Sequence, residues 1–348
     1  MPFLRDVFTL IISKNIGFLD DASPKCMSNF NRVLIEDSTC IKLSDSLFDH
    51  FSGVSNGACS KTITRLQVCI DLIKSKFENV QITTYSKNDI SFSSNIVNRL
   101  QPNDLVIRDL GYWKTSVLNS IHQKGAYFIS WLRNRGIIKD LSNEKYDLLN
   151  TLKSLDVQKG THFELLCKLN NQDNMTIKLI ANKVSKKQYK HRMQQARKSR
   201  HKDCKIHSDT QHLLSCEIFI TNAVDNEITN EEIKKLYKLR RQIDVFFKNW
   251  KSNYKVQKLL KSSTGSDPIK PEILMYLSLI YMAAIFQPNY LKYKESIAKK
   301  FDESLSSLQF GVFLKSVYKI RMPTETFINQ IQKYCCCDNR KDRFNMQI

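Results

Sequence analysis

The stretch IKKLYKLRRQIDVFFKNWKSNYKVQKLLK, Ile233 to Lys261, is the part of the sequence that decides the fold. Within it, Arg240, Asp244 and Lys251 follow Tyr237 at offsets of 3, 7 and 14 residues. At about 100° per residue in an α-helix, these four side chains fall within roughly 60° of one another. The spacing therefore predicts one long helix that presents a carboxylate, a phenol and two cations along one stripe.

A neighbouring arc of the same predicted helix is apolar. Its members are Leu236, Leu239, Ile243, Phe246, Phe247 and Trp250. An amphipathic helix of this kind buries its apolar arc and leaves its polar stripe accessible. The simplest interpretation of that stripe is a surface face on which Arg240 and Asp244 form an i, i+4 ion pair, worth about 0.2–0.5 kcal/mol. The alternative is a functional face.

Composition and charge indicate a globular protein with a polyanionic partner. Of its 348 residues, 42% are hydrophobic and 25% charged, which suffices for a full core in one large domain or two. The formal net charge is +20 and the isoelectric point about 9.5. So large a surplus favours nucleic acid as the partner, although a merely basic surface has the same charge.

Neither a zinc site nor a membrane span is expected. No C-x2-C pair of cysteines faces a second such pair, so the ten cysteines indicate reduced thiols in the cytoplasm. The longest apolar run, Ile273 to Phe286, is shorter than the roughly 20 residues that a transmembrane helix needs. It predicts a buried helix in a helical region beyond Gly265.

A first candidate acid lies on a predicted central strand. Arg32 to Ser44 (RVLIEDSTCIKLS) alternates with period two, and its apolar start on both faces predicts a buried strand that carries Asp37. An acid there is costly unless a cation or solvent reaches it. The alternative is an Asp at a strand end, hydrogen-bonded to the following Ser38 and Thr39.

A second candidate acid, Asp109, lies within a predicted βαβ unit. The strand Asp104 to Asp109 (DLVIRD) is followed by Gly111, a helix from Trp113 to His122 and a strand from Ala126 to Leu132. Loops at the carboxyl ends of parallel strands are where α/β sheets place their sites. We therefore expect Asp109 at a functional edge of the sheet.

The segment between Leu132 and Ile233 is β-rich by its patterns. His162 to Asn170 and Met175 to Ala181 alternate and predict a hairpin. Lys186 to Lys205 is dense in Lys and Arg, with no acid before Asp203. Such a run is commonly a solvated face, but in a basic protein it is at least as well suited to phosphate contacts. The candidate contacts are Lys186, Lys187, Lys190 and Arg192.

The pattern Y-x2-R-x3-(acid)-x6-K, present as LYKLRRQIDVFFKNWKS, resembles the tyrosine–arginine–glutamate–lysine signature of bacterial DDE transposases, insertion-sequence family four. DLVIRDLGYW…GAYFISWL is similar to that family's second-aspartate region. The resemblance covers roughly Val33 to Phe286. Two positions depart from the family: Asp244 stands where the family has Glu, and Arg241 where it usually has Trp.

The resemblance implies an enzyme, a DDE-type transposase that acts as DNA endonuclease and strand transferase. It would cut at insertion-sequence ends and join the 3′-hydroxyl strand to target DNA. Its two Mg²⁺ or Mn²⁺ ions would lie about 4 Å apart and support in-line attack on phosphorus. The implied catalytic and metal-binding residues are Asp37, Asp109 and Asp244, and the implied DNA contacts are Tyr237, Arg240 and Lys251. One methylene less at Asp244 would impair activity.

The implied partners are double-stranded DNA, both transposon ends and target, and a second copy of the chain in a synaptic homodimer. No membrane is involved, and the expected location is cytoplasmic and nucleoid-associated. Asp37 lies near the start of the chain, which suggests an amino-terminally truncated copy. The alternative function is therefore a catalytically silent, DNA-binding remnant of such a transposase. A stand-alone structure-selective nuclease with the same core is a third alternative.

The implied fold class is α/β, with a ribonuclease H-like mixed sheet core, a β-rich insertion and a helical C-terminal region. The expected parts are an N-terminal helical remnant (1–31), the core (32–135 and 227–262), the insertion (136–226) and the C-terminal region (263–348). The helices predicted in that last region are Glu272 to Phe286, Tyr290 to Phe301, Glu303 to Tyr318 and Thr324 to Tyr334.

Overall fold

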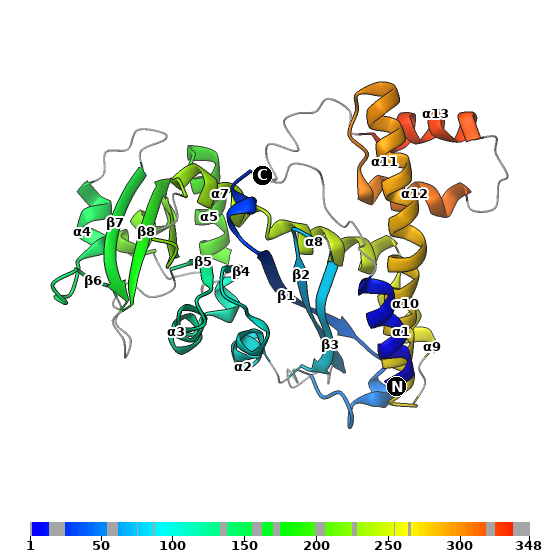
Figure 1. The fold of residues 1–348 in the computed structure, drawn as a ribbon. Coiled ribbons are helices and arrows are strands. Elements are labelled where there is room, and N and C mark those ends of the chain that lie inside the picture. The colour runs from blue at the N-terminus through cyan, green and yellow to red at the C-terminus, as the bar shows by residue number, and fades with distance from the viewer. Residues whose placement is uncertain are drawn as a thin grey trace. The chain divides into compact units, whose positions relative to one another are not determined.

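Helices and strands of the chain belong to two units in the computed structural model (Figure 1). The first unit comprises Met1–Ser23, Ile35–Asn88 and Lys238–Ile348, and the second comprises Pro24–Leu34 and Asp89–Tyr237. The residues that the structure describes are 2–13, 25–53, 62–74, 76–85, 88–132, 138–154, 162–169, 175–198, 206–224, 228–253, 255–263, 266–317 and 324–336.

The strands of the first unit follow the order β3-β2-β1. Their bounds are β1 (Arg32–Lys42), β2 (Ile63–Asp71) and β3 (Lys76–Thr84). The pair β2–β3 is antiparallel, with an irregularity between Cys69 and Ile70. On β1, Val33, Leu34 and Ile35 are all buried, so consecutive side chains on both faces are covered. The apolar start of this strand predicted that burial.

Helices of the first unit come from both ends of the chain. Before the strands lies α1 (Pro2–Ser13). The others are α8 (Arg241–Lys248), the π-helical turn η6 (Asn249–Asn253), α9 (Val256–Ser263), α10 (Lys270–Tyr281), the π-helical turn η7 (Met282–Phe286), α11 (Gln287–Phe301), α12 (Ser307–Val317) and α13 (Thr324–Cys335). The predicted helical C-terminal region is therefore confirmed.

The helix that contains the apolar run Ile273 to Phe286 is longer than the run itself and extends from α10 through η7 to the end of α11. Lys270–Phe301 is long and apolar enough to cross a membrane by length and composition, which the core helix of a globular protein also satisfies. Tyr276 is buried, and its ring lies 5.8 Å from that of Phe8 in α1. The turn η7 widens just before Pro288, whose nitrogen cannot donate to the carbonyl four residues back.

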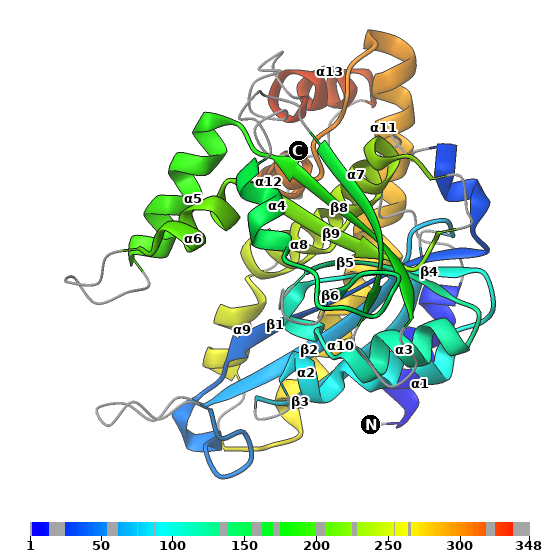
Figure 2. The same cartoon turned by 90° about the vertical axis from the view of Figure 1, so that its left-hand side faces the viewer.

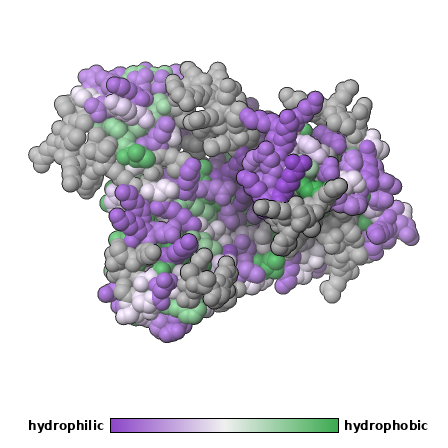
Figure 3. All heavy atoms as spheres, turned by 180° about the vertical axis from the view of Figure 1, so that it is seen from behind, coloured by the Kyte–Doolittle hydropathy of each residue, from purple (hydrophilic) through white to green (hydrophobic). Residues whose placement is uncertain are grey.

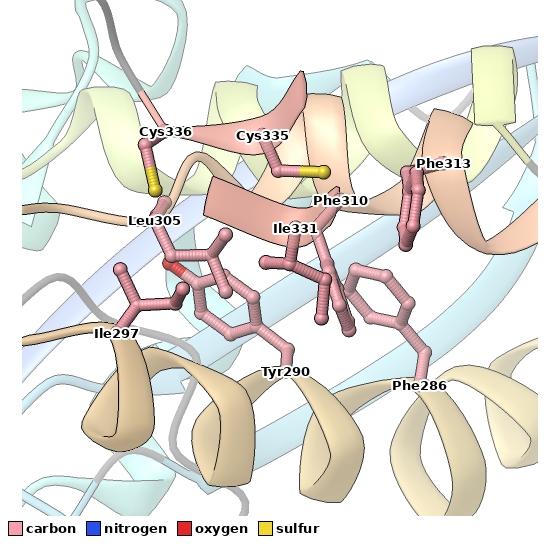
Figure 4. Packing of buried hydrophobic residues seen from close by; sticks show 9 residues of the cluster. All are labelled: Phe286, Tyr290, Ile297, Leu305, Phe310, Phe313, Ile331, Cys335 and Cys336. Carbon is pink, nitrogen blue, oxygen red and sulfur yellow. The ribbon is translucent and has the colours of Figure 1, made fainter. Parts of the chain in front are cut away.

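The last three helices enclose a separate apolar cluster (Figure 4). Its buried members are Phe286, Tyr290, Ile297, Leu305, Phe310, Phe313, Ile331, Cys335 and Cys336. The hydroxyl of Tyr290 is satisfied within this apolar environment because it donates a hydrogen bond to the carbonyl of Leu305 at 2.9 Å. Burial raises the pKa of the Cys335 thiol to about 12, so this cysteine behaves as a small apolar side chain.

The second unit holds the start of β1 and continues as β4-β5-β9-β8-β7-β6. The bounds are β4 (Asp104–Arg108), β5 (Tyr127–Trp131), β6 (Ile138–Lys139), β7 (His162–Leu169), β8 (Thr176–Lys183) and β9 (Cys216–Thr221). β4 and β5 are parallel, whereas β5–β9, β9–β8, β8–β7 and β7–β6 are antiparallel. The predicted mixed sheet, βαβ unit and β7–β8 hairpin are confirmed.

Helical segments of the second unit are mostly short. They are η1 (Lys25–Asn29), α2 (Asp89–Phe92), η3 (Ser93–Arg99), η4 (Leu110–Tyr112), α3 (Thr115–Gln123), α4 (Leu148–Ser154), α5 (Lys186–Lys198), α6 (Ser208–Leu214) and α7 (Asn230–Lys238). α4 buries Leu148 and Leu152. Figure 2 shows α5 beside α6. The basic residues at 199–205 lie outside the described residues.

The stretch Ile233 to Lys261 is not the single helix that its spacing predicts. It is divided among α7, α8, η6 and α9. After α7 the backbone tightens, because the N–H groups of Gln242 and Ile243 bond to carbonyls only three residues back. Lys255, with φ of 48°, lies between η6 and α9. At the start of α7, Thr229 and Glu232 form a capping box.

Asp71, the last residue of β2, has a buried carboxyl group. Its side chain is 0% exposed, and Oδ1 accepts from the backbone N–H of Ile73 at 3.0 Å. Oδ2 is buried without a hydrogen-bond partner among the described residues. Burial is the main cause that raises the pKa of this carboxyl above its usual range. A carboxyl with a raised folded-state pKa favours folding when protonated, and that contribution is lost as pH rises through the raised pKa.

We therefore expect Asp71→Asn to increase the free energy of unfolding at pH 7 by about 1 kcal/mol, because the amide keeps the acceptor for Ile73 without a buried charge. The gain should shrink toward pH 4. The measurement is urea denaturation of parent and variant at both pH values. A gain that does not change with pH would contradict the assignment.

Candidate active site

Asp37 lies in the middle of β1 with its carboxylate held on both oxygens. Oδ1 accepts from the backbone N–H of Ser38 at 2.7 Å, and Oδ2 accepts from Nη1 of Arg240 at 2.9 Å. The side chain is 14% exposed. The bond to Ser38 is the one expected of a strand-end Asp, but the position is internal to the strand. A cation compensates the acid, as its place on a buried strand requires.

Arg240 joins two of the acids that the sequence singled out. Its Nη2 donates to Oδ2 of Asp244 at 3.4 Å, while Nη1 donates to Asp37, which lies 203 residues away in the chain. Asp244 is in the first turn of α8 and is 51% exposed, whereas Arg240 is 19% exposed. The predicted i, i+4 ion pair exists, but the same guanidinium also binds the central strand.

Lys251 makes a hydrogen bond in the first unit, and Tyr237 makes ring contacts in the second. In the first unit, Lys251 on η6 donates from Nζ to the carbonyl of Cys40 at 2.8 Å, and burial lowers the pKa of its ammonium. In the second unit, the Tyr237 ring lies 4.9 Å from that of Phe219 and 6.1 Å from that of Trp131. Both side chains are therefore fixed by their neighbours.

Asp109 follows β4 in the second unit, at the edge of the sheet where the βαβ pattern predicted it. Its backbone is extended, and its carbonyl accepts from Tyr112 at 3.1 Å to start η4. A Cβ on Gly111 would lie 3.1 Å from Oδ2 of Asp89 and 3.8 Å from Oδ2 of Asp109. Such a Cβ would be tighter than usual against Asp89 and in ordinary van der Waals contact with Asp109. No sequence pattern pointed to Asp89.

The arrangement around Arg240 suits a divalent cation in its donor chemistry. Mg²⁺ and Mn²⁺ prefer carboxylate oxygens and keep several waters, so few protein ligands are needed. Asp37 and Asp244 both turn an oxygen toward one cationic group. In the part of the chain that the structure describes, no group of three or more His, Cys, Asp and Glu side chains gathers as a metal cluster. The joint site with Asp109 stays a prediction.

The predicted basic contacts on α5 separate into two kinds. Lys186, Lys187 and Lys190 are exposed. Arg192 instead donates to the carbonyl of Cys216 at 2.9 Å and to Glu217 at 2.8 Å, and its guanidinium lies 5.1 Å from the centre of the Trp131 ring. Desolvation lowers its pKa, and Glu217 opposes that effect. Hydrophilic residues also dominate the coloured surface in Figure 3.

Arg65 on β2 is a neighbour of the site that sequence reasoning missed. Its Nη1 donates to Oγ of Ser38 at 2.9 Å, and its guanidinium lies 5.3 Å from the centre of the Tyr85 ring. A third cationic side chain thus contacts the segment of β1 around Asp37. The available signal was a cationic residue inside the predicted strand pattern TITRLQVCIDLI.

Comparison with known proteins supplies the family. Residues 28–264 match the family described as the transposase DDE domain. The chain belongs to this family. The mixed α/β structure is consistent with the ribonuclease H-like core expected of such a DDE domain.

Relatives of this DDE domain include named transposases. It is 27% identical over 273 residues to the transposase for insertion sequence element IS231F of Bacillus thuringiensis subsp. israelensis, covering 73% of this chain and 56% of the relative. The transposase for IS1151 of Clostridium perfringens is 26% identical, with 75% and 58% covered. The chain thus spans little more than half the length of these relatives.

Among solved structures, a chain of the piggyBac transposase synaptic complex with hairpin DNA covers 86% of this chain and 56% of its own length. The identity is 10% and the TM-score 0.43, which makes the likeness a weak one.

The two kinds of cation on α5 predict different effects on stability. Arg192→Gln should lower the free energy of unfolding by about 1–3 kcal/mol, because it leaves the half-buried Glu217 without its cation. The matched control, Lys190→Gln, removes the same charge from an exposed position and should change stability by less than about 0.5 kcal/mol. Thermal or urea denaturation of both variants gives the comparison. Equal losses would argue against an anchoring role for Arg192.

Proposed function

We propose that this chain is the catalytic part of a DNA transposase that cuts at insertion-sequence ends and transfers the 3′-hydroxyl strand to target DNA. Membership of the transposase DDE domain family supports the proposal. The structural observation that carries it is the convergence of Asp37 and Asp244 on the single guanidinium of Arg240. A strand and a helix distant in sequence thereby bring two of the three family acids to one cation.

The proposed metal ligands are Asp37, Asp109 and Asp244, which would hold two Mg²⁺ or Mn²⁺ ions. When bound, these ions would neutralise charge at the reacting phosphate and lower the pKa of a water. Cutting uses water as nucleophile and joining uses the DNA 3′-hydroxyl, both by direct attack on phosphorus without a covalent enzyme intermediate. The chain's own side chains orient the phosphate.

Arg240, Tyr237 and Lys251 are the proposed DNA contacts near the reacting phosphate. A guanidinium can bind a phosphate through two parallel N–H donors. The Lys251 ammonium has three donors, so its bond to Cys40 leaves capacity for a phosphate oxygen. Lysines of α5 would contact the duplex further along. Two copies of the chain would bring two ends together, in the cytoplasm where the nucleoid lies.

One observation favours a second candidate function, a catalytically silent DNA-binding remnant. The third acid is Asp244 where the family has Glu, and half of its side chain is exposed. Losing one methylene shortens its reach to the other acids by about 1.3 Å, and a misplacement of about 1 Å at a reacting site can cost on the order of 100-fold in rate. The two functions differ in cleavage and share DNA binding.

DNA binding by α5 predicts a change in salt dependence. Replacing Lys186, Lys187 and Lys190 by Gln should flatten the slope of log affinity against log salt by about 0.9 for each phosphate that the helix no longer neutralises. Fluorescence anisotropy with a labelled duplex across a salt series measures this slope. The matched control replaces Lys292, Lys299 and Lys300 of α11 by Gln and removes the same charge. Equal flattening in both would show a general charge effect and remove α5 from the interface.

Metal-dependent cleavage tests the catalytic proposal. The parent chain, Asp244→Glu and Asp244→Ala are compared on duplex DNA that carries the element's own ends, with Mg²⁺ or Mn²⁺. We expect Asp244→Glu to be the most active, by up to about 100-fold, and Asp244→Ala to be inactive. If Asp244→Ala cuts as well as the parent, Asp244 is not a ligand. If all three bind DNA without cutting, the silent remnant replaces the transposase.

A further inference from the structure

Arg240 occupies a position that differs from an ordinary surface ion pair. Its two terminal nitrogens have separate partners, Asp37 on β1 and Asp244 on α8. Arg240 and Asp37 are 19% and 14% exposed, so this half of the contact is shielded from solvent, while Asp244 is 51% exposed. The guanidinium therefore bridges an inner and an outer carboxylate.

The hydrogen bonds of Arg240 occupy carboxylate oxygens that would otherwise be available to a metal ion. Oδ2 of each acid accepts from Arg240, and Oδ1 of Asp37 accepts from the Ser38 backbone. Two carboxylates drawn together repel each other unless a cation lies with them. A guanidinium and a divalent cation both meet that need, but they repel each other. The two cations are therefore expected to compete for the same carboxylate pair.

We propose that Arg240 closes the Asp37–Asp244 pair in the metal-free chain and gives up this place to a divalent cation, after which its guanidinium binds a DNA phosphate. This inference rests on the metal site proposed above. It makes Arg240 a positioning residue that alternates between two anionic partners. Metal and DNA then bind with positive coupling, because each favours the state in which the bridge is open.

The coupling has a defined sign and is reciprocal. Without DNA, opening the bridge costs the two charge-assisted bonds of Arg240, so the metal affinity is reduced by that cost. With DNA present, a phosphate replaces the carboxylates as partner of the guanidinium, and the metal affinity rises. By linkage, the metal must raise DNA affinity by the same factor.

The first test measures Mn²⁺ binding by titration calorimetry on the whole chain without DNA. Arg240→Gln should bind Mn²⁺ about tenfold more tightly than the parent. Its matched control is Arg241→Gln, which removes the same charge from the adjacent exposed position and should change the affinity less than about twofold. Equal tightening in both variants, or weaker binding by Arg240→Gln, would overturn the proposal.

The second test adds a short DNA duplex to the same titrations. The duplex should tighten Mn²⁺ binding several-fold in the parent and in Arg241→Gln, and not in Arg240→Gln. If Arg240→Gln does not fold by circular dichroism, Arg240→Lys takes its place. An ammonium is a point charge without the planar fork of a guanidinium, so it holds two acids less firmly, and this variant should also bind Mn²⁺ more tightly than the parent. Unchanged affinity would overturn the exchange.

A double variant separates failure of this inference from failure of the metal site. Asp37→Asn combined with Asp244→Asn should weaken Mn²⁺ binding at least about tenfold. If it binds Mn²⁺ like the parent, the metal site itself is wrong and the exchange falls with it. If the acids are needed for Mn²⁺ but Arg240→Gln behaves like Arg241→Gln, the metal site stands and only the exchange is refuted.

Discussion

The negative charge of a carboxylate on a buried strand must be compensated by a cation or by hydrogen bonds. Asp37 on β1 is such a carboxylate, and it lies in the first unit. The compensating cation is Arg240, which lies in the tight turn between α7 and α8 as the N-cap residue of α8. Two more cations contact the same part of β1: Arg65 through Ser38 and Lys251 through the carbonyl of Cys40. One acid thus lies among three positive side chains that tie β2, α8 and η6 to the strand.

Much of the fold could be predicted because local pattern and tertiary burial agree. The two-sided apolar start of β1, the βαβ unit around Asp109 and the hairpin of β7 and β8 all appear where the sequence places them. The long signature helix could not be predicted correctly, because a helical-wheel argument assumes a constant rotation per residue. The tightened turn before Gln242 and the π-helical turn η6 change that rotation.

The sequence predicted which residues belong to the candidate site, but not which side chains and carbonyls they contact. Spacing and family resemblance pointed to Arg240, yet its bond to Asp37 spans 203 residues and has no local signal. Lys251 and Tyr237 were expected to face DNA. The hydrogen bond of Lys251 to the Cys40 carbonyl and the ring contact of Tyr237 with Phe219 depend on which strands come near. Arg192 looked like its neighbouring lysines because charge composition does not distinguish an exposed cation from an anchored one.

The anchoring of Arg192 has a consequence for how α5 meets a polyanion. Its bonds to Cys216 and Glu217 and its place over the Trp131 ring fasten the helix to β9 and β5 before any ligand arrives. A disordered basic segment would lose backbone conformational entropy on binding, at roughly 1–2 kcal/mol per residue fixed. On α5 the backbone conformational entropy has already been lost when the protein folds. Association then orders only lysine side chains, and the charges meet the phosphates as a preorganised array.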